Sequence, residues 1–222
     1  MAEHPPGAAY REGKLMSASA PRWNRSDAPP ADRRKGARLR GILLGVVAGL
    51  AWAAALRAYM WQIGTDHEVT WAGTFFGILL AGAVAGGLLG WADARRRDGT
   101  MRGHRWFALA PFAFALTTLS LPGQLQALIS TGLGGGALGV PVIAVLGGFA
   151  LGHVGAKWLR AVAAALALAG IAGLISTVPI VGGDALSLST PRGLWVGILI
   201  GALMVLASAA ASVPFAAPVD PR

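Results

Sequence analysis

Residues 41–63 read GILLGVVAGLAWAAALRAYMWQI and carry a single charged side chain, Arg57. A helix rises about 1.5 Å per residue, so this stretch is long enough to cross a hydrocarbon core about 30 Å thick. The composition of the chain agrees, since 55% of its 222 residues are hydrophobic and only 13% are charged. Soluble domains average roughly 25% charged residues. We therefore expect lipid, rather than water, to surround most of the chain.

Five further apolar runs follow the first one. They cover residues 69–92, 106–121, 138–153, 159–177 and 193–212. Such runs predict helices, because lipid offers no partner to an unpaired backbone polar group. We predict an all-α fold, an integral membrane bundle of six transmembrane helices over residues 40–213. For residues 123–137 three alternatives remain: an interfacial helix, a re-entrant segment or a loop. The glycines and Pro141 make the fourth run the best candidate for a broken helix.

Two tails flank the predicted bundle, residues 1–39 and 214–222. The first is rich in proline and charged residues and poor in aliphatic ones, which predicts disorder. Cations next to a membrane attract anionic lipid headgroups by about 1 kcal/mol each, and the alternative is that they only set the topology. The candidate headgroup residues are Arg33, Arg34, Lys35, Arg38 and Arg40, before the first run, and Arg95, Arg96 and Arg97, after the second.

The lysines and arginines are distributed unevenly about the runs. Seventeen of the 19 fall on one side of the predicted membrane, Arg192 falls on the other, and Arg57 lies within a run. Because positively charged loops stay in the cytoplasm, both termini are predicted to be cytoplasmic, in a bacterial plasma (inner) membrane. The cations that give the chain its net charge of +9 are thus expected at helix ends. Nucleic-acid binding would need one basic face on a folded domain, so we expect no nucleic-acid partner.

Three of the runs carry the same ladder of glycines, spaced four residues apart. Small residues at this spacing share one helix face and let two backbones approach closely within lipid. We expect the first, second and sixth spans to pack tightly, with a homodimer face as the alternative. The ladders are Gly41, Gly45 and Gly49, then Gly82, Gly86 and Gly90, and finally Gly193, Gly197 and Gly201.

Polar side chains gather between the first two runs. Arg57 lies inside the first run, where an arginine costs at least about 2.5 kcal/mol, so it needs a partner or a route to water. Its side chain either reaches the headgroups or pairs with Asp66 or Glu68, and a ligand-binding role is a further alternative. This candidate site, the polar cap, comprises Arg57, Tyr59, Asp66, His67, Glu68, Trp71, Gly73 and Thr74.

No catalytic or metal-binding pattern emerges from the sequence. Asp66, His67 and Glu68 are suitable zinc or manganese ligands, but adjacent side chains in an extended loop point in alternating directions. The chain has no cysteine, and its glycine-rich 132–136 run lacks the lysine of a phosphate-binding loop. We therefore expect no catalytic residue, no metal and no cofactor.

The segment Arg57-Ala58-Tyr59-Met60, followed by an acidic pair and then by Trp71-Ala72-Gly73-Thr74, resembles a pattern in uncharacterised polytopic membrane proteins of actinobacteria. The resemblance covers about the first two spans and implies no activity. It differs at Tyr59, where the pattern has a tryptophan. It implies that the following residues act together at the outer end of these spans: Arg57, Glu68, Trp71, Gly73 and Thr74.

These observations favour a membrane protein without enzymatic activity. We expect an accessory or interaction subunit, whose basic tail meets anionic lipid or a partner and whose polar cap is an extracytoplasmic docking surface. Its expected partners are the lipid bilayer and either another membrane protein or a second copy of the chain. The alternative is a small transporter or channel for an anion or small solute, with Arg57 and a broken fourth helix beside the path. The two functions differ in whether Arg57 faces a cavity or is engaged by the chain itself.

Overall fold

The computed structural model of the chain describes residues 31–64, 68–98, 104–123, 126, 129 and 135–216, and the side chains of 31–34, 104, 105 and 135 fall outside this description. Within these residues every regular element is a helix, which confirms the predicted all-α fold. The α-helices are α1 (Ala31–Ile63), α2 (Ala81–Arg97), α3 (Ala113–Leu119), α5 (Gly135–Leu151), α6 (Lys157–Gly182) and α7 (Pro191–Ala211). The other helical segments are η3 (Trp71–Leu80), η4 (His104–Phe112), η5 (Asp184–Leu186) and η6 (Val213–Phe215).

Four helical stretches among the described residues are long and apolar enough to cross a membrane. They are Lys35–Ile63, Trp71–Arg97, Lys157–Gly182 and Pro191–Ala211. This is the structure expected of a membrane protein. Two shorter apolar helices, Trp106–Leu119 and Gly136–Leu151, correspond to the predicted third and fourth spans.

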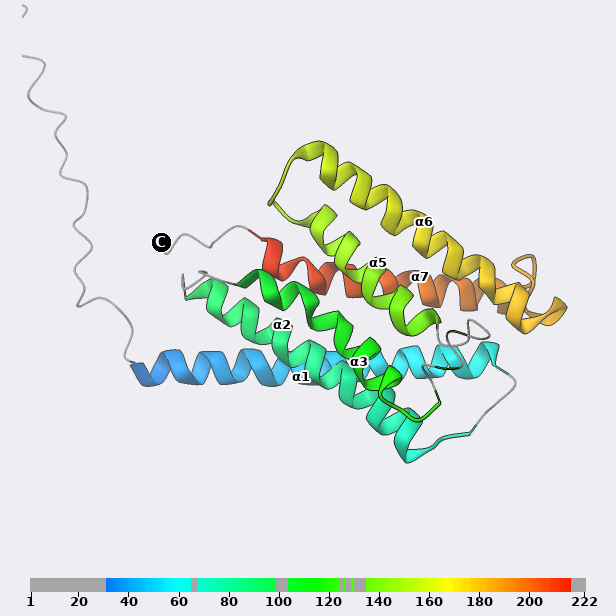
Figure 1. Cartoon of the computed structure of the whole chain (residues 1–222), viewed down its shortest axis with the longest axis horizontal. Helices are drawn as coiled ribbons and strands as arrows, with labels where there is room; N and C mark the ends of the chain where they lie inside the picture. Colours follow the sequence, from blue (N-terminus) through cyan, green and yellow to red (C-terminus); the bar gives the residue numbers. More distant parts are fainter. Residues whose placement is uncertain are drawn as a thin grey trace, which may run out of the picture.

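The helices run roughly along the long axis of the molecule (Figure 1). The N-terminal end of α1, the C-terminal ends of α2 and α7, and the turn between α5 and α6 lie at one end, on the left in Figure 1. We call this the basic end, because it holds Lys35, Arg38, Arg40, Arg95, Arg96, Arg97, Lys157 and Arg160. The far end, on the right, holds the end of α1 and the connection from α6 to α7.

Both boundaries of the bundle differ from the prediction. α1 begins at Ala31, so residues 31–39 are helical rather than part of a disordered tail. Alanine, arginine, lysine and leucine predominate there and are strong helix formers, which extends the helix beyond the apolar run. At the other boundary, Pro214 is buried and the His153 amide donates a hydrogen bond of 2.8 Å to the Phe215 carbonyl oxygen. The predicted C-terminal tail is therefore packed as far as Phe215, while residues 1–30 and 217–222 lie outside the described residues.

α1 and α2 pack antiparallel through two of the three glycine ladders. The rungs of this contact are Gly41 with Gly90, Gly45 with Gly86, and Gly49 with Gly82. A β-carbon on Gly45 would lie 2.2 Å from the Gly86 carbonyl oxygen, and one on Gly49 would lie 2.0 Å from the Gly82 carbonyl oxygen. Neither distance is possible for a real side chain, so backbone contact between α1 and α2 depends on glycine.

The third ladder, on α7, does not meet the first two, so the expected packing of the three spans does not run through all three ladders, although α7 does contact α1. A β-carbon on Gly193 would lie 2.1 Å from the Ser187 carbonyl oxygen, so this glycine admits the loop that enters α7. Gly197 and Gly201 both face Ile175 of α6, at 3.4 Å from a built β-carbon. A ladder of glycines thus marks a closely packed helix face, but it does not specify which element packs there.

A partly buried tryptophan, Trp52, joins α1 to the middle of the bundle. The indole N–H of Trp52 donates to the Leu203 carbonyl oxygen of α7 at 2.8 Å. The Trp52 ring also packs edge-on against Phe114 of α3, with 5.3 Å between ring centroids. Ile200 and Met204 of α7 are fully buried beside this contact region. Because hydrocarbon supplies no acceptor, the carbonyl bond lets the indole N–H be buried at low cost.

The second and third apolar runs each begin with a segment of irregular helix. Trp71–Leu80 is π-helical, and His104–Phe112, which contains Pro111, is a 3-10 helix. The Thr117 hydroxyl of α3 lies 2.9 Å from the Gly77 carbonyl oxygen of η3 and equally close to the Ala113 carbonyl oxygen of its own helix, and its one hydrogen can be donated to either. A π-helical turn disturbs the regular pairing of carbonyls, and this hydroxyl places a donor beside one of them.

The predicted break in the fourth helix is wrong. α5 runs as one α-helix from Gly135 to Leu151 with Pro141 inside it. Proline lacks an amide donor and crowds the carbonyl four residues before it, but Pro141 lies in the second turn, so both effects fall near the start of the helix and α5 continues beyond them.

Candidate functional site

Arg57 is held by groups of the chain itself at the far end of the bundle. Its Nε donates to the Thr74 hydroxyl at 3.3 Å, and its Nη2 donates to the Glu68 carbonyl oxygen at 2.6 Å. The guanidinium carbon lies 5.7 Å from the centre of the Trp61 ring, which is cation–π geometry. These contacts tie the end of α1 to the start of η3.

The start of η3 is shaped by Thr70. This residue has an extended backbone, and its hydroxyl accepts a hydrogen bond of 3.0 Å from the Gly73 amide, as helix-capping residues do. A β-carbon on Gly73 would lie 2.9 Å from that hydroxyl, so glycine allows the close approach. The capped turn places the Glu68 carbonyl oxygen and the Thr74 hydroxyl within hydrogen-bonding distance of Arg57, and both accept hydrogen bonds from it.

The structure thus brings together four residues of the predicted polar cap, Arg57, Glu68, Gly73 and Thr74. Glu68 contributes its carbonyl oxygen, which a residue of any type could supply. The prediction that Arg57 pairs with Asp66, and the placement of His67, fall outside the described residues.

Two other predicted cap residues lie elsewhere. The Tyr59 side chain is 5% exposed and lies within hydrogen-bonding reach of Thr177 on α6, so it belongs to the core. Trp71 is 80% exposed and packs on Phe75, with 4.7 Å between ring centroids. Trp71 therefore belongs to the outer surface of the cap rather than to the Arg57 contacts.

Sequence reasoning missed three residues at this end of the bundle. Trp61 follows Arg57 by four positions, a spacing that places both on one helix face and could have revealed the contact. Thr70 lies at the start of the second apolar run and directly precedes Trp71, and a threonine in such a place is a usual signal of a helix cap. Gln62, whose side-chain oxygen accepts from Arg192 at 3.2 Å, had no sequence signal because its partner lies on a distant helix.

The chemistry of the polar cap is that of hydrogen bonding and aromatic contact. No group of three or more histidine, cysteine or acidic side chains that could hold a metal ion occurs in the part of the chain that the structure describes. The guanidinium donors of Arg57 serve the backbone and a hydroxyl of the same chain. The arrangement is suited to holding a fixed surface.

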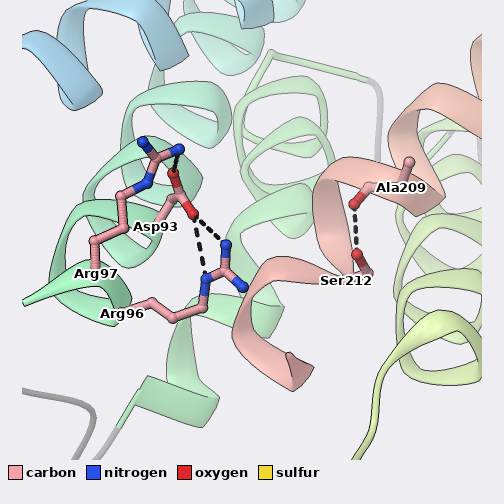
Figure 2. Close-up of polar contacts among 5 residues, drawn as sticks. All are labelled: Asp93, Arg96, Arg97, Ala209 and Ser212. Atoms are coloured by element: carbon pink, nitrogen blue, oxygen red, sulfur yellow. Dashed lines mark hydrogen bonds and ion pairs between the residues drawn. The ribbon is translucent and has the colours of Figure 1, made fainter. Parts of the chain in front are cut away.

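Acidic side chains at the basic end are paired with arginines. Asp93 accepts from Arg96 at 2.9 Å and from Arg97 at 2.6 Å through its two carboxylate oxygens, as Figure 2 shows. Asp98, at the end of α2, pairs with Arg38 of α1. These ion pairs neutralise both carboxylates, and the one between Arg38 and Asp98 connects the ends of α1 and α2.

The remaining predicted headgroup residues are arranged differently. The guanidinium of Arg95 lies 5.5 Å from the centre of the Trp91 ring. Lys35 and Arg40 are exposed, and neither takes part in an ion pair among the described residues. The side chains of Arg33 and Arg34 fall outside the description.

A groove, here termed the α1 groove, runs along one side of the α1–α2 pair. Its inner part is a cavity of about 710 Å³ between α1, α2 and α7, and Asp93 is the one charged residue that lines it. Its outer part, of about 800 Å³, opens at the basic end and is lined by Arg38, Arg40, Arg97, Asp93 and Asp98 among smaller residues. Both parts share Gly45, Ala48, Gly90 and Asp93, and Arg57 lines neither.

The wall of the groove that α7 provides ends in a closed turn. The Ser212 hydroxyl donates to the Ala209 carbonyl oxygen at 2.7 Å, across from the Asp93 ion pairs in Figure 2. Beyond this point α1 and α2 alone line the outer part of the groove.

A scan against protein-family models and searches of the curated proteins and of the solved structures find no match to this chain.

Proposed function

We propose that this chain is a non-enzymatic, multi-pass protein of the bacterial plasma membrane that acts as an accessory or interaction subunit and contacts its partner at the polar cap. The observation that carries this function is the engagement of Arg57 by Glu68, Thr74 and Trp61. A guanidinium used in this way is a structural group. It fixes the shape of this surface, which reduces the conformational entropy that the surface itself would lose when a partner docks.

In the proposed topology all six apolar helices cross the bilayer, with both termini in the cytoplasm. The apolar part of η4, Trp106–Phe112, and α3 have seven residues each, which at rises of about 2.0 and 1.5 Å per residue reach about 25 Å. The 17 residues of α5 reach about 26 Å. Both lengths approach the hydrocarbon thickness of about 30 Å, and the positive-inside rule assigns the basic end to the cytoplasm.

The exposed part of the cap has the composition of a contact surface. Trp71 is 80% exposed, and Trp61, whose ring contacts Arg57, is 41% exposed. Tryptophan combines a large apolar face with one donor, and it is enriched both in protein interfaces and at the edge of the bilayer. A membrane-protein partner that presents acceptors and apolar side chains at this depth would fit the surface.

The alternative of a small transporter or channel has less support. A transporter of this kind requires a broken fourth helix and an Arg57 side chain that faces the path of the solute. α5 is continuous, and the inner α1 groove is lined by apolar residues apart from Asp93. An anion or a small polar solute would lose its hydration there without compensating hydrogen bonds.

Photocrosslinking in native membranes tests the proposed docking surface. A benzophenone amino acid replaces Trp71 in the full-length chain, and the matched control replaces Trp195, which is 53% exposed near the start of α7 at the same end. We expect one protein adduct of defined mass from position 71 and only lipid adducts from position 195. Lipid adducts alone at both positions would contradict the proposed function.

A further inference from the structure

We propose that the α1 groove is a binding site for an anionic phospholipid, with an acyl chain lying along the glycine and alanine surface of α1 and the headgroup held at Arg40 and Arg97. The site lies at the basic end, opposite the polar cap, and does not depend on the function proposed there.

The inner groove has the surface that an acyl chain requires. On α1 it is lined by small residues, Gly45, Ala48 and Gly49, with Leu206 and Ala207 of α7 opposite. Its volume of about 710 Å³ lies within the roughly 300–1,000 Å³ of small-molecule sites. A groove at this depth that opens to the bilayer is surrounded by hydrocarbon, and leaving it empty would forfeit dispersion contacts along its walls.

The depth of the groove agrees with the position of a lipid. If Ile63 marks the outer edge of the hydrocarbon, about 20 helical residues bring α1 to the inner edge near residue 43. Arg38 and Arg40 then lie at the level of the headgroups. The lining residues from Gly45 to Ala55 lie at the level of the acyl chains.

The charges at the mouth of the groove select an anionic headgroup. Asp98 neutralises Arg38, and Asp93 is shared between Arg96 and Arg97. Arg40 lines the mouth and, among the described residues, has no carboxylate partner. Its guanidinium, together with the exposed Arg97, can bind one phosphate group by charge-assisted hydrogen bonds.

A lipid accounts for both parts of the groove at once. The apolar cavity and the cationic mouth share four lining residues, so one ligand with an apolar tail and an anionic head spans them. A transmembrane helix from another protein would fill the apolar part and leave the cationic mouth unused, and free phosphate would do the reverse.

Native mass spectrometry of the full-length chain tests the site. The purified protein in mild detergent is titrated with phosphatidylglycerol or with phosphatidylcholine, and lipid-bound masses are counted. We expect one phosphatidylglycerol to be retained preferentially. Arg40→Gln should weaken this binding about fivefold, whereas Arg95→Gln, which removes an arginine outside the groove, should leave it unchanged.

A second pair of variants tests the acyl part. Ala48→Leu fills the groove where its two parts join, and Ala54→Leu adds the same group on the exposed face of α1 outside both parts. We expect Ala48→Leu to abolish retention and Ala54→Leu to preserve it, with thermal unfolding showing that both variants are folded. Glycerol phosphate, which has the head without the chains, should not compete.

Three results would overturn the proposal. The first is equal retention of the two lipids, and the second is equal behaviour of the two members of either pair of variants. The third is a stoichiometric polypeptide that co-purifies with the chain and is lost in Ala48→Leu without any change in lipid.

Discussion

Arg57 shows at the scale of one residue how a charge is accommodated within an apolar helix. The cost of the charge could be predicted from the sequence, and the need for a partner followed from it. The identity of the partners could not be predicted, because a backbone carbonyl at Glu68 has no sequence signature. Tyr59 was misplaced for a related reason, since its neighbour Thr177 lies on a distant helix.

Replacing Arg57 by alanine should destabilise the protein. The change removes two hydrogen bonds and one cation–π contact, which predicts a loss of about 2–3 kcal/mol in the free energy of unfolding. Arg57→Lys should recover only part of this, because an ammonium group lacks the planar fork. Thermal unfolding in detergent measures both.

Arg192→Ala is the control, because this exposed arginine makes a single bond of 3.2 Å to Gln62 and its loss should change stability by less than about 0.5 kcal/mol. Unchanged stability in Arg57→Ala together with a lost cellular phenotype would contradict the structural role and indicate a ligand contact.

For Ser208 we predict the opposite effect, a gain of stability when the side chain is replaced. Its side chain is 4% exposed, and its hydroxyl has no hydrogen-bond partner among the described residues. It lies against α5, where a β-carbon on Gly147 would be 2.2 Å from the hydroxyl oxygen. Ser208→Ala removes an unpaired polar group with little change in shape, so we expect a gain of about 1 kcal/mol in detergent unfolding.

The matched variant for this site is Ser176→Ala, at an exposed serine bonded to the Gly173 carbonyl oxygen, where we expect almost no change. A clear loss of stability in Ser208→Ala would mean that the hydroxyl is bonded in the membrane, for example to water or lipid.

At the scale of the helix, the glycine ladders make a quantitative prediction. Gly49→Ala places a β-carbon 2.0 Å from the Gly82 carbonyl oxygen, which must separate α1 from α2. We expect a loss of at least about 2 kcal/mol, as for overpacking of a core. Gly173→Ala on α6 meets nothing within 4 Å and should instead stabilise its helix by about 0.5–1 kcal/mol. Equal effects of the two variants in thermal unfolding would refute the backbone contact.

The same helices show what sequence patterns can specify about an element. The period of four identified the crowded face of each ladder, but it is identical in all three, so it could not identify which ladders meet. In the third span the structure has a 3-10 helix that contains Pro111, a residue that disfavours a regular α-helix. Nothing in the sequence of Trp71–Leu80 indicated a π-helix, because an apolar run of this kind predicts a helix without specifying its hydrogen-bond pattern.

At the scale of the molecule, the uneven distribution of cations and the length of each helix bear on the topology. Helix type and existence followed from the apolar runs, since lipid leaves few alternatives. The number of crossings is less constrained, because η4–α3 and α5 are close to the minimum length. They either cross the bilayer in turn, which makes six spans, or enter from the basic end and return as a re-entrant hairpin, which makes four.

Position 122 distinguishes these two topologies, because it follows α3 at the tip of that helical pair and its side chain is exposed. The natural chain has no cysteine, so Pro122→Cys, Ser189→Cys and Lys157→Cys each provide a single thiol. With six spans, a membrane-impermeant maleimide added to intact cells should label positions 122 and 189 and leave position 157 unlabelled until the cells are opened. Labelling at 189 with protection of 122 in both intact and opened cells would establish the hairpin, and labelling of 157 from outside would reverse the proposed orientation.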